Sequence, residues 1–224
     1  MISAFGKALD QMVEPAFRRV LIQALALTIL AYLAVGIGAW YGIDALPRFG
    51  MPWLDAMIHV LSGIGLALAM AFLFPAAAGL FISFFLDDVA AAVEGRYYPA
   101  DRPGRPLPVA PALVEALWFG LLVVVTNLLV LPLYLLMLWF PPVNLVIFYT
   151  LNGYLLGREY FELVAWRHLD RHAAAALRKA YRGRIFLAGL VIAGLFSLPL
   201  VSLLAPLAAT AAMVHIFKGL EVKA

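Results

Sequence analysis

Four long stretches without a charged side chain dominate the pattern of hydrophobic and polar positions. Lys, Arg, Asp and Glu are absent from Val20–Ile43, Ala56–Leu86, Ala116–Gly157 and Ile185–Phe217. A helix needs about 20 predominantly apolar residues to cross the hydrocarbon core of a bilayer. A charge at the bilayer centre costs roughly 2.5–3.5 kcal/mol. The pattern therefore predicts an all-α, polytopic integral membrane protein, with residues 1–224 forming a single membrane domain.

The first two stretches each have the length of one spanning helix. We expect residues 20–43 to cross the membrane, with Trp40 and Tyr41 near the far interface, where such rings are enriched. Residues 56–86 are expected to form a second spanning helix, which kinks or ends at Pro75. Small residues at four-residue spacing in this helix (Gly63, Ala67, Ala71) predict close packing against another helix.

The last stretch, residues 185–217, is divided by Pro199 and Pro206. Each arm reaches only about 20 Å as a helix, whereas the hydrocarbon core is about 30 Å thick. Two such arms predict a hairpin that enters and leaves the membrane by the same face. Residues 116–157 also carry central prolines (Pro132, Pro141, Pro142), and here two full crossings or a second partly penetrating hairpin both fit.

The distribution of basic residues predicts the orientation. Cytoplasmic loops of membrane proteins are enriched in Lys and Arg. Basic residues cluster on both sides of residues 116–157, which places both flanks in the cytoplasm. The loop from Asp44 to Asp55 has Arg48 as its single basic residue and is expected to be external. This pattern predicts an inner-membrane, multi-pass protein with both termini in the cytoplasm. Residues 1–19 and the stretch Arg158–Arg184 are each expected to form an amphipathic helix at the membrane surface.

Composition supports the membrane assignment and excludes other classes. Hydrophobic residues make up 65% of the 224 residues and charged residues 13%, compared with about 45–50% and about 25% in soluble domains. The net charge of +3 does not indicate nucleic-acid binding, because the bases flank apolar stretches. The absence of cysteine excludes disulfides and thiolate chemistry.

Signals for catalysis are weak. His168 and His172 are four residues apart, but no H-E-x-x-H motif, phosphate-binding loop or nucleophile elbow is present. We therefore expect no catalytic residue, metal or cofactor. The sequence leaves open a membrane-embedded lipid-modifying enzyme, which would need a group of catalytic residues around Asp87, Asp88 and His172.

One local arrangement indicates an anion site, at Glu14-Pro15-Ala16-Phe17-Arg18-Arg19. Proline suits the first position of a helix, and the backbone N–H groups that follow are unpaired donors at the positive end of the helix dipole. Arg18 and Arg19 add guanidinium groups, whose planar forks suit oxyanions. The predicted anion-binding residues are Ala16, Phe17, Arg18 and Arg19. The alternative is that the arginines anchor the helix to anionic headgroups.

The chain resembles the CysZ sulfate permeases and the wider etoposide-induced membrane-protein family. The resemblance rests on Phe5–Leu21 (FGKALDQMVEPAFRRVL), on Leu151–His168 and on Tyr181–Lys218, and on the order of the segments. It implies two long spanning helices, two partly penetrating hairpins, a homo-oligomer, and sulfate uptake that supplies cysteine synthesis. The family's glycine-leucine-arginine sulfate motif corresponds to Ala16, Phe17 and Arg18, with Arg19 beside it.

The leading hypothesis is thus transport of sulfate or a related oxyanion. Glu115, Arg158 and Glu159 are further candidates for polar groups near the pathway, because ionisable residues at the ends of membrane hairpins often mark one. The alternative from another class is a membrane-organising scaffold that binds anionic lipid through Arg158–Arg184 without transporting anything.

Overall fold

The computed structural model describes residues 2–45, 49–106, 109–198 and 201–221, without the side chains of a few of them (Ile2, Pro75, Ala76, 109–113, Glu115, Ala116, Phe119, Glu221). All regular secondary structure in these residues is helical, which confirms the predicted all-α class. The chain divides into two compact units, unit 1 with residues 1–17 and 86–224 and unit 2 with residues 18–85.

Unit 2 contains the two long apolar helices. α2 runs from Pro15, just before the unit boundary, to Asp44, and α3 from Pro52 to Ser83. They are about 45 and 48 Å long, and both are long and apolar enough to cross a membrane. α3 continues through residue 75, so it does not end at the proline. Its small residues Gly63, Ala67 and Ala71 do not contact a helix in unit 2, because Ala67 and Ala71 are exposed and a Cβ on Gly63 would meet open space.

In unit 1, the C-terminal helix α9 (Ala205–Glu221) lies at the centre. Every residue from 205 to 218 is buried, because α9 packs against α1 (Ile2–Gln11), α4 (Leu86–Tyr97), α6 (Pro141–Ala165) and α8 (Arg182–Phe196). A helix that carries apolar side chains on every side, as α9 does between its few polar residues, is stable only when it is enclosed. Its many alanines let the neighbouring helices approach closely.

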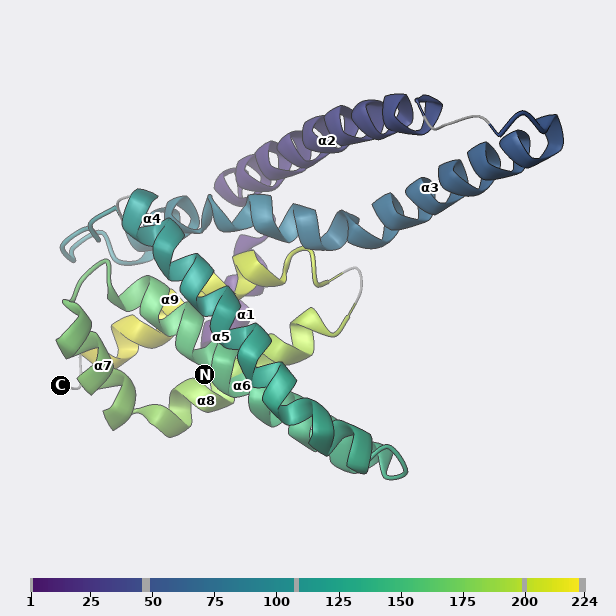
Figure 1. The fold of residues 1–224 in the computed structure, drawn as a ribbon. Coiled ribbons are helices and arrows are strands. Elements are labelled where there is room, and N and C mark those ends of the chain that lie inside the picture. Colours follow the sequence, from purple (N-terminus) through teal and green to yellow (C-terminus); the bar gives the residue numbers. More distant parts are fainter. Residues whose placement is uncertain (1, 46–48, 107–108, 199–200, 222–224) are drawn as a thin grey trace. The chain divides into compact units, whose positions relative to one another are not determined.

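α6 and α8 pack side by side in unit 1 (Figure 1). Glycines make their close contact possible. A Cβ on Gly189 would overlap the backbone of Gly153 and Gly157, and a Cβ on Gly157 would lie 2.6 Å from the carbonyl oxygen of Ile185. The two backbones are therefore in direct contact at these positions, which only glycine permits. These three glycines were not predicted from the sequence as a contact.

The lengths of the helices bear on the hairpin predictions. α5 (Val109–Leu136, with Pro132 inside it) and α6 are about 42 and 38 Å long, so full crossings and a deep hairpin both still fit. α8 and α9, with 15 and 17 residues, reach about 22 and 26 Å. Both fall short of the roughly 30 Å core. Pro199 lies outside the described residues, and Pro206 is in the first turn of α9. Partial penetration stays a prediction.

The prediction of one amphipathic helix over Arg158–Arg184 is wrong. α6 ends at Ala165, α7 runs from Arg171 to Ala180, and α8 starts at Arg182. The break has a local cause, because the carboxylate of Asp170 accepts a hydrogen bond from the N–H of Ala173 at 2.8 Å and so caps a new helix. The turn between α6 and α7 directs Arg167 into the interior, where it is 2% exposed.

The predicted helix over residues 1–19 is shorter than expected, because α1 ends at Gln11 and α2 starts at Pro15. The buried face of α1 is made of small and polar residues. Ala4, Ala8 and Gln11 are buried on the helix that packs against α9. The larger apolar residues Leu9 and Val13 are 56% and 77% exposed. This exposed apolar side is compatible with contact to a bilayer surface.

Candidate functional site

The predicted anion-binding residues form the first turn of α2. Pro15 is the first helical residue, where its missing N–H costs nothing. The side chains of Ala16, Arg18 and Arg19 are exposed, whereas Phe17 is only 2% exposed. Phe17 thus anchors the turn, and the two guanidinium groups point into the surroundings.

The electrostatic surroundings of this turn are favourable for an anion. Neither Arg18 nor Arg19 forms an ion pair with any residue that the structure describes. Glu14, the acidic residue next to the turn, is engaged elsewhere, because its carboxylate lies 3.2 Å from Nη1 of Arg96. The N–H groups of Ala16 and Phe17 precede the first intrahelical hydrogen bonds. Backbone donors and two uncompensated guanidinium groups can together bind a tetrahedral oxyanion.

A second polar group of residues, buried in unit 1, surrounds Glu94. Arg167 donates from Nε to Oε1 of Glu94 at 3.3 Å and from Nη2 to Oε2 at 3.1 Å, and it also bonds the Asp87 carboxylate. The N–H of Gly104 donates to Oε2 of Glu94 at 3.2 Å. Nε2 of His168 lies 2.8 Å from Oε1 of the same carboxylate. We call these residues (Asp87, Glu94, Gly104, Arg167, His168) the Glu94 cluster.

The charge of Glu94 is strongly stabilised within this cluster. Burial by itself raises the pKa of Glu94, but the hydrogen bonds from His168 and Arg167 outweigh it and lower the pKa to about 2. The pKa of Arg167 is raised, because its bonds to Glu94 and Asp87 outweigh the effect of burial. The cluster therefore links α4 to the turn after α6 through a charged pair, Glu94 and Arg167, whose hydrogen bonds are made within unit 1.

A third polar group joins α1 to α9. Nε2 of Gln11 lies 3.0 Å from Nε2 of His215, and the Tyr98 hydroxyl lies 2.9 Å from Nδ1 of the same imidazole. Tyr97 packs edge-on against the His215 ring, with 5.2 Å between centroids. Gln11 is fully buried and His215 is 6% exposed. These hydrogen bonds fix the helix that leads into the first turn of α2.

The weaker candidates for pathway groups are placed as follows. Nε of Arg158 lies 3.0 Å from Oε1 of Glu162, and Nε of Arg178 lies 3.1 Å from the same oxygen. Arg158 is therefore already paired within unit 1. Glu159 is half-buried in α6. Glu115 is part of α5, and its side chain lies outside the described residues.

The two members of the pair His168 and His172 lie in different surroundings, and so do the two members of the pair Asp87 and Asp88. His168 belongs to the Glu94 cluster, whereas His172 is exposed. Asp87 bonds Arg167, whereas Asp88 is exposed. Over the residues with described side chains, no three His, Asp or Glu residues are grouped so that they could hold a metal ion.

Sequence reasoning missed the buried roles of Glu94, Arg167, Gln11 and His215. A signal for Glu94 was present, because it follows the buried residues Leu86, Val89, Ala90 and Val93 at helical spacing, and an acid on an apolar face needs a partner. For Arg167 and His215 the partners are distant in the sequence, and no local pattern indicates them.

Comparison with known proteins supports one family. The model of the family described as sulfate transporter CysZ/etoposide-induced protein 2.4 matches residues 4–206. This range includes the first turn of α2, Gln11 on α1 and Glu94 on α4. No individual curated protein matches the chain at a significant level. The matched range, together with two helices suited to crossing a bilayer, identifies a membrane protein that belongs to the CysZ/etoposide-induced protein 2.4 family.

Proposed function

We propose that this protein transports sulfate, or a related oxyanion, across the cytoplasmic membrane and so supplies sulfate for assimilation into cysteine. The family to which it belongs is described as a sulfate transporter family. The observation that carries the proposal is the exposure of Arg18 and Arg19 on the first turn of α2, without an ion pair to any described residue.

The binding step follows from this geometry. The N–H groups of Ala16 and Phe17 lie at the positive end of the dipole of a 30-residue helix. A dianion placed there accepts hydrogen bonds from these donors and from the guanidinium groups of Arg18 and Arg19. Arg18 and Arg19 are the binding residues in this proposal.

The proposal also covers the topology of the protein, its assembly and the path of the anion. We place both termini in the cytoplasm, with several membrane crossings, and expect a homo-oligomer. Glu115, Arg158 and Glu159 are proposed to lie near the pathway. For Arg158 this requires that the ion pair with Glu162 at 3.0 Å be compatible with passage of an anion, because a paired guanidinium attracts an anion less than a free one.

The test is uptake of radiolabelled sulfate into liposomes that contain the purified protein, with selenate and chloride as competitors. We expect flux above that of empty vesicles, inhibition by selenate rather than chloride, and loss of sulfate binding in Arg18→Ala and Arg19→Ala. Arg182→Ala, at an exposed base on α8, is the matched control and should bind as the wild type does. Wild-type binding by Arg18→Ala in calorimetry would remove the site assignment.

A scaffold that binds anionic lipid is the second candidate. α7 and the start of α8 expose several basic side chains (Arg171, His172, Lys179, Arg182), and such surfaces bind anionic headgroups. Two results would favour this function over transport. Vesicles with the protein would show no sulfate flux, and the purified protein would retain anionic lipid, less of it in Lys179→Ala.

A further inference from the structure

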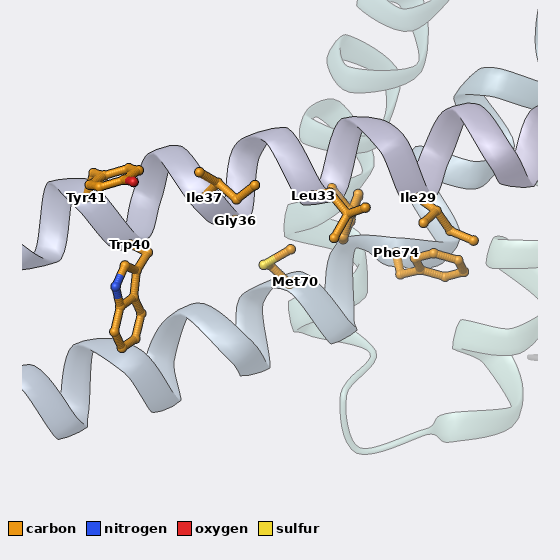
Figure 2. Close-up of a pocket in the computed structure, with 9 residues that line it drawn as sticks. Ile29, Leu33, Gly36, Ile37, Trp40, Tyr41, Met70 and Phe74 are labelled. Carbon is orange, nitrogen blue, oxygen red and sulfur yellow. The ribbon is translucent and has the colours of Figure 1, made fainter.

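An open, apolar groove lies between the two long helices of unit 2. It has a volume of about 480 Å³, and its walls are side chains of α2 and α3 (Ile29, Tyr32, Leu33, Gly36, Ile37, Trp40, Tyr41, Met70, Phe74). Figure 2 shows the Trp40 ring hanging from α2 toward α3 at one end, with Met70 and Phe74 reaching toward α2 further along.

Side chains, rather than close backbones, hold the two helices together along this groove. Tyr32 meets Phe74 edge-on, with ring centroids 5.5 Å apart. A Cβ on Gly36 would lie 3.3 Å from the terminal methyl of Met70. Gly36 therefore keeps the groove open on the α2 side, because any larger side chain there would enter it.

The size and chemistry of the groove select its occupant. Its walls offer hardly any hydrogen-bonding groups, so water is disfavoured there. From Ile29 to Tyr41 the groove extends about 18 Å along α2. One leaflet of hydrocarbon is about 15 Å thick, so a single extended acyl chain fits.

The two ends of the groove differ in polarity. Trp40 and Tyr41 are 63% and 70% exposed and lie near the end of α2, whereas Ile29, Tyr32 and Phe74 line the other end, where the Tyr32 ring packs edge-on against Phe74. Amphipathic rings favour the level of the lipid headgroups. A phospholipid in the groove would thus place its glycerol region near these two rings and its chain terminus toward Ile29 and Phe74.

We propose that the groove between α2 and α3 is a binding site for one acyl chain of a phospholipid, in the leaflet on the side of Trp40. The bound chain completes the packing of two helices that otherwise touch at few side chains. This site is separate from the first turn of α2, so the proposal does not depend on sulfate transport.

The first experiment measures phospholipid retained by the full-length protein after extensive washing in detergent, by native mass spectrometry. We expect a retained phospholipid on the wild type and a several-fold loss in Gly36→Leu, whose side chain fills the groove. Gly38→Leu is the matched control, because a Cβ on Gly38 would meet open space. Equal retention by Gly36→Leu and the wild type would overturn the proposal. Helix content by circular dichroism verifies that both variants fold.

The second experiment locates the chain. In a variant that keeps Trp40 and has phenylalanine at Trp53, Trp118, Trp139 and Trp166, a phospholipid with brominated acyl chains, added at low ratio in detergent, should quench the fluorescence. Gly36→Leu should abolish this quenching. A reference that keeps Trp53 instead, which is exposed on α3, should be quenched much less. Equal quenching of Trp40 and Trp53 would contradict a specific site.

A second copy of the chain is the other occupant to be tested. The chain contains no cysteine, so Gly36→Cys introduces a unique thiol in the groove. Formation of a disulfide-linked dimer in native membranes would show a neighbouring copy at this position and overturn the lipid assignment. Absence of the dimer, together with lipid retention by the wild type, supports it.

Discussion

Arg167 and Glu94, 73 positions apart in the sequence, form a bidentate pair in which the guanidinium donates to both carboxylate oxygens, at 3.3 and 3.1 Å. Arg167 is 2% exposed and Glu94 is 5% exposed. This pair connects α4 with the turn between α6 and α7. Because both charges are buried, each depends on the other for its stability.

Removal of one partner should therefore be costly. Glu94→Ala leaves the Arg167 charge with Asp87 as its remaining acid, and breaking a buried pair costs about 3–5 kcal/mol. We expect a clear drop in the thermal unfolding midpoint in detergent, measured by loss of the monodisperse peak after heating. Asp88→Ala, at an exposed acid on the same helix, is the control. A similar midpoint for Glu94→Ala and Asp88→Ala would contradict the role of the pair.

The lowered pKa of Glu94 gives a pH dependence with a definite sign. The pKa is about 2 in the folded protein, compared with 4.5 for a free carboxyl. A carboxylate with a depressed folded pKa contributes stability that is complete above the unfolded pKa and is lost as pH falls toward the folded one. The difference in unfolding midpoint between the wild type and Glu94→Gln should thus be constant above pH 5 and shrink between about pH 4.5 and pH 2. A difference that stays constant over that range would rule this out.

The contact between α6 and α8 should not tolerate a methyl group at Gly189. A Cβ there would overlap the backbones of Gly153 and Gly157, so the helices must separate, at a cost of about 1–3 kcal/mol or more. We expect Gly189→Ala to lower the unfolding midpoint. Gly194→Ala in the same helix, where a Cβ meets open space, should be neutral or slightly stabilising, because alanine has the higher helix propensity. Equal midpoints for the two variants would show that the backbones are not in contact.

The polar link between α1 and α9 should control the exposure of the N-terminal helix. His215→Ala removes the hydrogen bonds to Gln11 and Tyr98 and leaves a buried amide without its partner, which costs about 1–3 kcal/mol. We expect faster tryptic cleavage at Lys7, followed by mass spectrometry of the released fragments. His172→Ala, at an exposed histidine, should be cleaved at the wild-type rate. Unchanged cleavage in His215→Ala would mean that α1 is held by its alanine face alone.

The sequence was informative wherever the cause of a structure is local. The helical class follows from the charge-free stretches, because a long apolar segment in lipid must satisfy its backbone hydrogen bonds internally. The first turn of α2 also begins at the predicted Pro15. These features depend on neighbouring residues, so a single sequence contains the information.

Features that depend on distant partners were missed or stay predictions. The stripe Gly63, Ala67 and Ala71 predicted close packing but meets no helix in unit 2, whereas the contact forms at Gly153, Gly157 and Gly189. Spacing alone shows where close approach is sterically possible, and the partner helix decides whether it occurs. The same reason applies to the Glu94 cluster, and to the break at Asp170, where one capping side chain outweighs the continuing amphipathic pattern.

The enclosed position of α9 has a consequence for biosynthesis. All of the helices that surround it (α1, α4, α6, α8) precede it in the chain, so each of them leaves the ribosome before the helix that fills the space between them. Until α9 follows, the faces of these four helices that pack against it lack their partner in unit 1. The packing of α1, α4, α6 and α8 in this unit is thus complete only after α9 has been translated.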